Sequence, residues 1–249
     1  MTFSLCRSIK EKITNFESMY KNMIIMKLYK YFLILTFAAL AITSCGLDNY
    51  DAPQSVLRGK VTYNGETLGV RGTGEAVQLQ LYQAGYQLKN NIPVFVSQDG
   101  TFQAVLFDGE YKLVTRNQNG PWVNSRDTTV INVKGTTDIE VKVTPYFTIS
   151  NESLTLNGSV FNTTFNVNQV VTTAKIDYVT LLLSKTSFVD DVSNFARKDF
   201  KGQQAGVINL SMDLSANNDF KNATAVFGRV GVRTVGADQA IYSKVVRLK

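Results

Sequence analysis

The sequence contains no histidine among its 249 residues. Imidazole is the usual general base beside a nucleophilic serine or cysteine, and it is the commonest metal ligand. Its absence therefore excludes Ser-His-Asp and Cys-His sites and any zinc site built on imidazole. Glycoside hydrolysis remains open, because that reaction needs only two carboxylates across a cleft.

The acidic residues form no clear pair of that kind. The nearest candidates are Asp99, Asp108 and Glu110, but both aspartates begin Asp-Gly turns, where the side chain commonly bonds the local backbone. Asp190 and Asp191 lack the spaced acids of a calcium loop, so we interpret them as a solvated loop. The sequence predicts a protein that is not an enzyme and has no cofactor and no metal site.

No apolar run of spanning length is evident in the sequence. The stretch from Tyr31 to Ile42 has 12 residues, whereas a membrane-spanning helix needs about 20. Lys27 and Lys30 precede this stretch, and Thr43-Ser44-Cys45 follows it. A buried core helix is rarely flanked in this way, so the order indicates a bacterial lipoprotein signal peptide.

Cys45 is then the lipidated first residue of the mature protein, and its acyl chains anchor it stably to a membrane. The signal peptide covers residues 26–44, and residues 45–53 form a lipidated tether. Because Met26 directly precedes the charged segment, we interpret residues 1–25 as an overextended start.

Cysteine is scarce as well, since Cys6 is the only other one and lies before the signal peptide. The mature protein therefore has no internal disulfide. The net charge of +6 falls to +2, because residues 1–44 hold six Lys or Arg and two Asp or Glu. No basic stripe remains, so nucleic acid is not an expected partner.

Apolar and polar residues alternate along most of the mature chain. Residues 77–82, 139–143 and 161–168 each show the period of a half-buried antiparallel strand. The turn signals between such runs are Asn64-Gly65, Asp99-Gly100, Asp108-Gly109, Asn119-Gly120 and Asn157-Gly158. The sequence therefore predicts an all-β protein with short connections.

Proline occurs only four times, and Pro145 separates two strand patterns. Because proline lacks the donor that a sheet ladder needs, we expect a domain boundary there. The prediction is two tandem β-sandwich domains, of residues 54–145 and 146–249, each with about seven strands. Domains of about 100 residues can hold ordinary hydrophobic cores without disulfides.

Specific segments carry a resemblance to known families. Residues 59–68, 77–82, 99–102 and 107–113 resemble a carboxypeptidase-regulatory or transthyretin-like sandwich. Residues 227–234 and 242–247 resemble the last hairpin of a fibronectin-III-like or immunoglobulin-like sandwich. With the opening segment 44–53, the layout resembles the two-domain lipoproteins grouped as domain of unknown function 3823.

The resemblance implies a setting rather than an activity. Such proteins occur in Gram-negative glycan-scavenging bacteria beside starch-utilisation-type systems, whose TonB-dependent outer-membrane transporter is then an expected partner. Asp48 and Asp51 resemble the acidic signal that sends lipoproteins of these bacteria to the cell surface, although a solvated linker has the same composition. We expect an outer-membrane, surface-exposed protein.

A candidate glycan-binding site lies in residues 116–126, which hold the only tryptophan among polar side chains. An exposed Trp122 indole would stack on a sugar ring, while amide and guanidinium groups would bind its hydroxyls. The residues concerned are Trp122, Arg116, Asn119, Asn124 and Arg126, with Tyr86 on a second wall. The alternative is that Trp122 packs on the edge of a sandwich.

These observations favour a noncatalytic surface lipoprotein that binds or presents glycan as an accessory of an uptake system. The first alternative is a structural spacer or partner-docking module of the transporter assembly. The second is a glycosidase, which would depend on carboxylates alone.

Overall fold

The computed structural model describes residues 19–21, 23, 25–30, 32–33, 51–85 and 90–249. The chain divides into two compact units, residues 1–51 and 52–249. In the first unit, the described residues from 19 to 33 are helical and exposed. No helix in the described part of the chain is both long and apolar enough to cross a bilayer. Cys45, Asp48 and Tyr86 lie outside the described residues, and so does most of the expected signal peptide.

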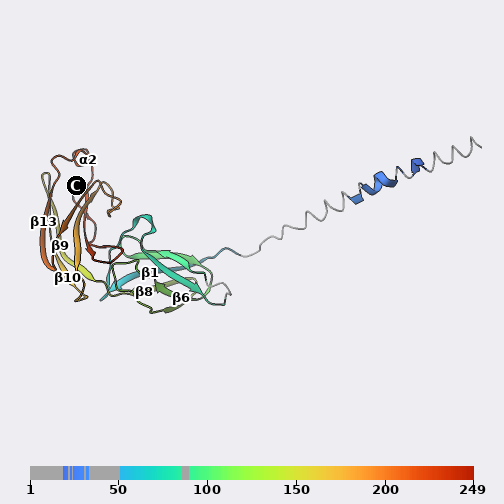
Figure 1. The fold of residues 1–249 in the computed structure, drawn as a ribbon, viewed down its shortest axis with the longest axis horizontal. Helices are drawn as coiled ribbons and strands as arrows, with labels where there is room; N and C mark the ends of the chain where they lie inside the picture. The colour runs from blue at the N-terminus through green and yellow to red at the C-terminus, as the bar shows by residue number, and fades with distance from the viewer. Residues whose placement is uncertain (1–18, 22, 24, 31, 34–50, 86–89) are drawn as a thin grey trace, which may run out of the picture. The chain divides into compact units, whose positions relative to one another are not determined.

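The second unit begins with an N-terminal lobe of eight strands in two sheets (Figure 1). In one sheet β1 pairs with β2, β5 and β8. The second sheet has the order β4-β3-β6-β7. The strands are β1 (Ser55–Tyr63), β2 (Glu66–Thr67), β3 (Gln78–Gln83), β4 (Ile92–Phe95), β5 (Thr101–Leu106), β6 (Gly109–Thr115), β7 (Thr129–Val133) and β8 (Thr136–Lys142). A 3₁₀ turn, Thr73–Glu75, lies between β2 and β3.

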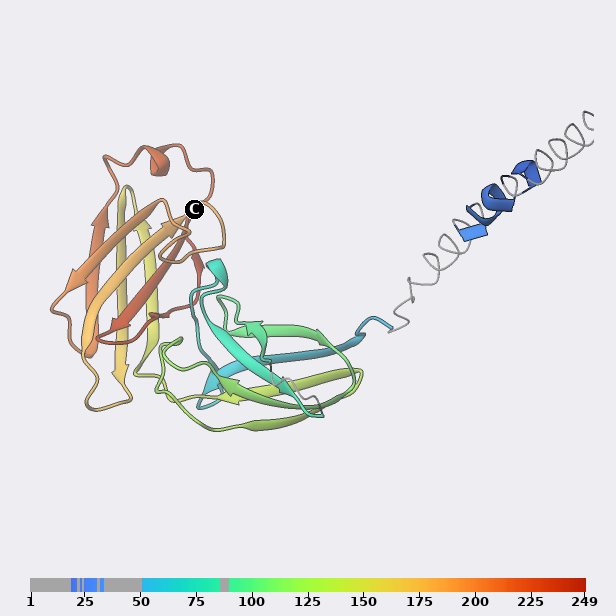
Figure 2. The same ribbon diagram turned by 45° about the vertical axis from the view of Figure 1, so that its right-hand side comes forward.

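The C-terminal lobe also has eight strands, in sheets of three and five (Figure 2). The smaller sheet has the order β13-β10-β9; in the larger, β12-β11-β14 is completed by β15 and β16, which both pair with β14. The strands are β9 (Phe147–Asn157), β10 (Val160–Gln169), β11 (Ile176–Ser184), β12 (Ala196–Lys201), β13 (Gly206–Asp213), β14 (Phe227–Thr234), β15 (Ile241–Tyr242) and β16 (Val246–Arg247). The four-residue helix α2 (Asn218–Lys221) precedes β14.

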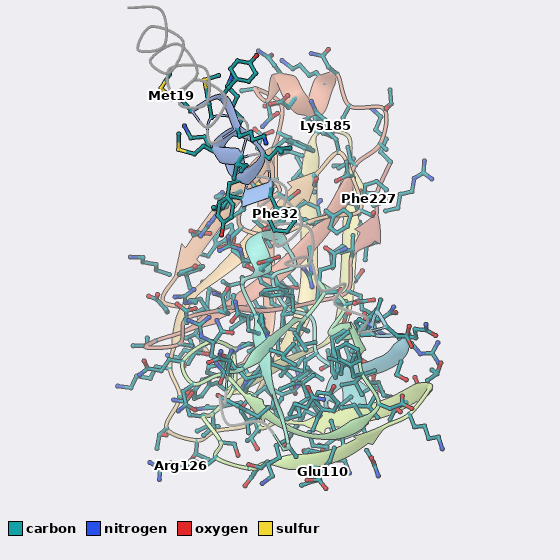
Figure 3. The ribbon with its side chains drawn as sticks, turned by 90° about the vertical axis from the view of Figure 1, so that its right-hand side faces the viewer. Met19, Phe32, Glu110, Arg126, Lys185 and Phe227 are labelled. Carbon is teal, nitrogen blue, oxygen red and sulfur yellow. The ribbon has the colours of Figure 1, made fainter. Side chains whose placement is uncertain are left out.

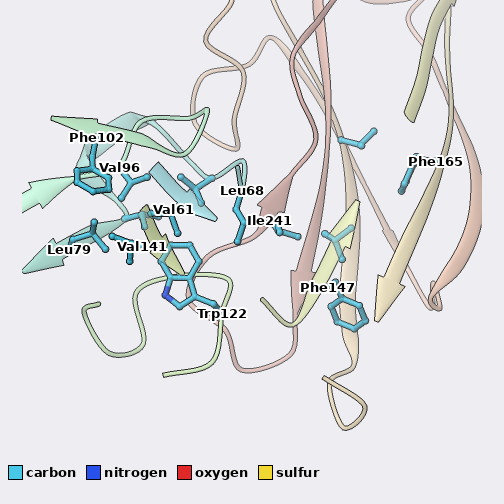
Figure 4. Close-up of a cluster of buried hydrophobic side chains, with 14 of the residues drawn as sticks. Val61, Leu68, Leu79, Val96, Phe102, Trp122, Val141, Phe147, Phe165 and Ile241 are labelled. Carbon is cyan, nitrogen blue, oxygen red and sulfur yellow. The ribbon is translucent and has the colours of Figure 1, made fainter. Parts of the chain in front are cut away.

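The alternation of apolar residues correctly predicted which side chains are buried. Val77, Leu79 and Leu81 are fully buried at β3, and Phe161 and Phe165 are at most 1% exposed on β10. Buried side chains of both lobes belong to one continuous hydrophobic cluster, part of which Figure 4 shows. The prediction of a mostly β protein is confirmed.

Strand β8 corrects one expectation, because it pairs with β1 in parallel. The predicted antiparallel direction was wrong. Alternation reports only which face of a strand is buried and carries no information on the neighbour's direction. Here the chain leaves β7 through a short turn and crosses to the other sheet, where β8 pairs with β1 from Val56 to Thr62.

Four of the five predicted turns have their glycine at positive φ, and the first joins β1 to β2 with Asn64 and Gly65 both at positive φ. Gly120 is the exception, since it is not among the positive-φ residues. A Cβ atom there would lie 2.3 Å from Cε2 of Trp122, so this position needs glycine for space rather than for backbone freedom.

Candidate functional site: a pocket between the lobes

The two lobes are joined by direct hydrogen bonds within residues 52–249. The amide of Tyr242 donates to the carbonyl of Gly69 over 3.0 Å. The side chain of Gln98 donates to the Ser187 carbonyl over 2.7 Å and accepts from the Val189 amide over 3.2 Å. One of these bonds is between main chains and two use the side chain of Gln98, and together they hold the two lobes against each other.

Arg229 on β14 lies at the centre of this junction and is only 1% exposed. It donates to the carbonyls of Val70 and Gln98 in the N-terminal lobe, over 3.0 and 2.6 Å. It also donates to those of Ser243 and Val189 in its own lobe, over 2.8 and 3.0 Å. Its guanidinium lies 4.6 Å from the ring centre of Tyr242. Burial lowers the pKa of Arg229 to about 10, which leaves the group charged at neutral pH.

Asp190 is buried at the same junction, so its interpretation as part of a solvated loop was wrong. Its carboxylate accepts from Gly72 and Thr73 of the N-terminal lobe and from the amides of Val192 and Ser193. Burial alone would raise the pKa of Asp190, but the hydrogen bonds outweigh it and hold the pKa below its usual range. The neighbouring Asp191 pairs with Arg71 over 3.5 Å.

We expect Asp190→Asn to lower the free energy of unfolding by about 1–3 kcal/mol at pH 7, because an amide nitrogen would face N–H donors. A carboxyl whose folded pKa is lowered adds stability above the unfolded pKa of about 3.9, and that stability is lost as the pH falls through the folded pKa. The difference between wild type and variant should therefore shrink from pH 7 to pH 2.5 in urea titrations. Asp138→Asn, at a surface pair with Arg58, is the control. A pH-independent difference would contradict this account.

A pocket of about 640 Å³ opens beside this junction. The N-terminal lobe contributes residues 63–64, 66–69 and 98–99, and the C-terminal lobe contributes residues 148–152, 229 and 241–245. Tyr63 is half-buried and adds an aromatic ring, while Leu68, Ile149 and Ile241 add apolar surface. We call this the junction pocket. Its volume is in the range of small-molecule sites.

The wall of the junction pocket on β9 is irregular. Ser153 pairs with Thr164 and Ser150 with Asn166, so Asn151 and Glu152 oppose a single residue of β10. Asn151 takes a positive φ of 53° at this β-bulge. Bulges aim side chains away from a regular ladder and are frequent beside functional sites. A run of polar residues within a strand pattern, 150–153, was the available sequence signal, and the sequence-based prediction missed it.

Trp122 lies elsewhere, and the expectation that its indole is exposed was wrong. The residue is 3% exposed and belongs to the hydrophobic cluster with Val61 and Val141 (Figure 4). The main chain around it pairs with the segment between the lobes: Val123 donates to Thr144 over 2.9 Å, and Tyr146 donates to Pro121 over 3.1 Å. A covered indole offers no face to a sugar ring, so the packing alternative holds.

The polar residues of the same loop are mostly used within it. Asn119 is buried and joins the loop to the start of β3, donating to Ala76 over 2.7 Å and accepting from Gln78 over 2.6 Å. Asn124 accepts from the Gln118 amide, and Arg116 donates to the Gln78 side chain. Arg126 points outward at the edge of the lobe (Figure 3). Asn124 and Arg126 share a second hollow of about 400 Å³, which Trp122 does not line.

The acids considered for hydrolysis are dispersed. Asp99 binds its own turn, accepting from Thr101 Oγ1 over 2.7 Å, and lies on the junction pocket. Asp108 accepts a hydrogen bond from Ser55, and Glu110 is exposed at the edge of the N-terminal lobe (Figure 3). In the described part of the chain no three His, Cys, Asp or Glu residues are grouped as metal ligands would be.

Residues 52–249 thus define a class of protein: mostly β, with four sheets in two lobes that are hydrogen-bonded around a pocket. The chain belongs to the DUF3823 family. Residues 55–144 match its N-terminal domain, described as a protein of unknown function, and residues 147–247 match the DUF3823_C domain of unknown function. The family resemblance is confirmed, whereas the lipoprotein and transporter setting stays a prediction.

Solved structures support the same assignment. A DUF3823 protein of Parabacteroides merdae is 58% identical, with 80% of this chain and 100% of that chain covered and a TM-score of 0.78. A Bacteroides ovatus member is 32% identical, covering 78% and 98%, with a TM-score of 0.72. A Bacteroides uniformis structure, described as a proposed carbohydrate binding protein, is 20% identical, covers 80% and 100%, has a TM-score of 0.67 and shows the shared fold. No curated protein matches the chain.

Proposed function

We propose that this protein is a noncatalytic, lipid-anchored protein of the bacterial outer-membrane surface that binds glycan as an accessory of a TonB-dependent uptake system. The observation that carries the glycan part is the junction pocket, since both lobes line it with polar groups and Tyr63 adds an aromatic ring. The description of the Bacteroides uniformis relative as a proposed carbohydrate binding protein agrees with it.

The chemistry of the pocket suits a sugar. Asn64 and Asn151 carry amides, Glu66 and Glu152 carry carboxylates, and Lys244 carries an ammonium group. Amides and carboxylates accept hydrogen bonds from hydroxyl groups, while amides and ammonium donate to them. Apolar surface beside such groups covers the faces of a sugar ring. Because the lobes are already fixed by Arg229 and Asp190, the pocket is formed before a ligand arrives, which lowers the cost of ordering on binding.

Glycan arrays probed with the full chain in detergent should identify a ligand with at most millimolar Kd. Tyr63→Ala should weaken that binding about two- to tenfold, since an aromatic contact is worth about 0.5–1.5 kcal/mol. Tyr82→Ala is the matched control, because Tyr82 is also a half-buried tyrosine of this lobe but does not line the pocket. The glycan proposal fails if nothing on the array binds, or if both variants weaken binding equally.

The lipid anchor is tested separately at Cys45. Cells given a clickable palmitate analogue should label the wild-type protein, and Cys45→Ser should abolish the label and release the chain from the membrane fraction. Thr43→Ser is the control, because it changes a residue beside Cys45 but keeps the cysteine and a small side chain before it. Labelling of Cys45→Ser at the wild-type level would refute the lipoprotein proposal.

A spacer or docking role is the second candidate, favoured by the hydrogen-bonded junction of the two lobes. The spacer or docking role is favoured over glycan capture if the protein binds no glycan but copurifies with the transporter. Tyr63→Ala should then leave the copurification unchanged.

A further inference from the structure

The junction pocket is lined by more negatively charged than positively charged side chains. Three carboxylates, Glu66, Asp99 and Glu152, line it, and Lys244 is the exposed cation. Arg229 also lines the pocket, but it is buried, and the carboxylate of Asp190 stabilises its charge. The net charge of the exposed side chains that a ligand meets in the pocket is therefore negative.

The guanidinium of Arg229 is used within the protein itself. Four of its five N–H groups meet carbonyl oxygens of Val70, Gln98, Val189 and Ser243. Because Arg229 is only 1% exposed, it supports the wall of the pocket from behind rather than offering a group to a ligand. The groups left for a ligand are carboxylates such as Glu152, to which a hydroxyl group can donate its own hydrogen, and the exposed ammonium of Lys244, from which it can accept. A negatively charged group can accept but cannot donate.

We propose that the junction pocket selects uncharged glycans with free hydroxyl groups and excludes glycans that carry uronate or sulfate groups. This proposal rests on the proposed function and names the ligand class of the same site. Two like charges about 7 Å apart in water weaken binding about threefold, and a partly enclosed pocket increases the effect. Three carboxylates opposed by one lysine should therefore disfavour an anionic ligand about tenfold.

The test uses pairs of glycans that share a backbone and differ in charge. Galacturonate oligosaccharides are compared with their methyl esters, and xylo-oligosaccharides with glucuronate branches are compared with unbranched ones. Titration calorimetry with the full chain should give at least about tenfold tighter binding of an uncharged member. Raising the salt from 20 to 500 mM should reduce the ratio, because salt screens exposed charges.

The variant Glu66→Gln/Glu152→Gln should reduce the ratio about tenfold, and Glu110→Gln/Glu140→Gln, with exposed acids outside the pocket, should leave it unchanged. Thermal unfolding of both variants checks their folding. Equal or tighter binding of the anionic member, or a ratio that the pocket variant leaves unchanged, overturns the selectivity and leaves glycan binding standing. Absence of binding to every glycan removes the proposed function and this proposal together.

Discussion

Arg229→Met should lower the free energy of unfolding by about 3–5 kcal/mol, because it breaks a buried charge cluster by removing one partner. The methionine stem can replace much of the packing but none of the donors. The carbonyls of Val70, Gln98, Val189 and Ser243 would each lose a hydrogen bond, and the buried Asp190 would lose its cationic neighbour. An orphaned buried acceptor is costly in itself.

Urea unfolding measures this effect, and the single tryptophan makes the measurement specific. Fluorescence of Trp122 reports the N-terminal lobe, whereas circular dichroism reports both lobes. The two signals should coincide in the wild type and separate in Arg229→Met, since Arg229 bonds across the lobes. Arg229→Lys should rescue little, because an ammonium group lacks the planar fork of donors.

Arg197→Met is the matched control for Arg229→Met. Arg197 pairs with Asp199 over 2.8 Å at the surface of β12, so its loss should cost at most about 1 kcal/mol. An equal cost for both substitutions, or a cost for Arg229→Met below that of the control, would contradict the role of Arg229 as the joint of the two lobes.

The strands could be predicted from the sequence because each has one buried face. At Val77, Leu79 and Leu81 the local pattern and the tertiary burial agree, and the positive φ of Asn64 and Gly65 follows from their preference for this backbone. The direction of β8 could not be predicted, since it depends on which strand becomes its neighbour.

The junction could not be predicted for a related reason. Asp190 accepts hydrogen bonds from Gly72 and Thr73, which lie 118 and 117 residues away in the chain. No local pattern encodes such a partner, and an Asp-Asp pair ordinarily indicates a solvent-exposed loop. Arg229 follows Gly228 in a strand that is buried on both faces, and a charged residue in such a run was an overlooked signal of a buried cluster.

Trp122 shows how one sequence feature supports two opposite structures. A lone tryptophan among amides and arginines is typical of a site where a sugar ring stacks on the indole. The same residues can instead hold a loop together by packing and hydrogen bonds. Here Asn119 fixes the loop to β3, and Gly120 leaves space for the indole. The choice depends on whether another segment covers the ring, and residues 144–146 pair with the main chain beside it.

Trp122→Ala should therefore act on stability, with a loss of about 3–5 kcal/mol in the free energy of unfolding. The substitution would leave a cavity in the hydrophobic cluster that contains Val61 and Val141, next to the segment that joins the lobes. Trp122→Phe should cost only about 1–2 kcal/mol. It keeps an aromatic ring, and the indole N–H that it removes has no hydrogen-bond acceptor among the described residues.

Both variants are measured by circular dichroism in urea, because the fluorescent probe is lost. Glycan affinity is measured alongside, below the unfolding temperature of each variant. A core tryptophan outside the junction pocket should leave the Kd of the folded fraction within about twofold, since its contacts are not shared with the ligand. The opposite pattern, an unchanged free energy of unfolding with a tenfold weaker Kd, is what a stacking residue would give, and it would return the binding site to the loop of residues 116–126.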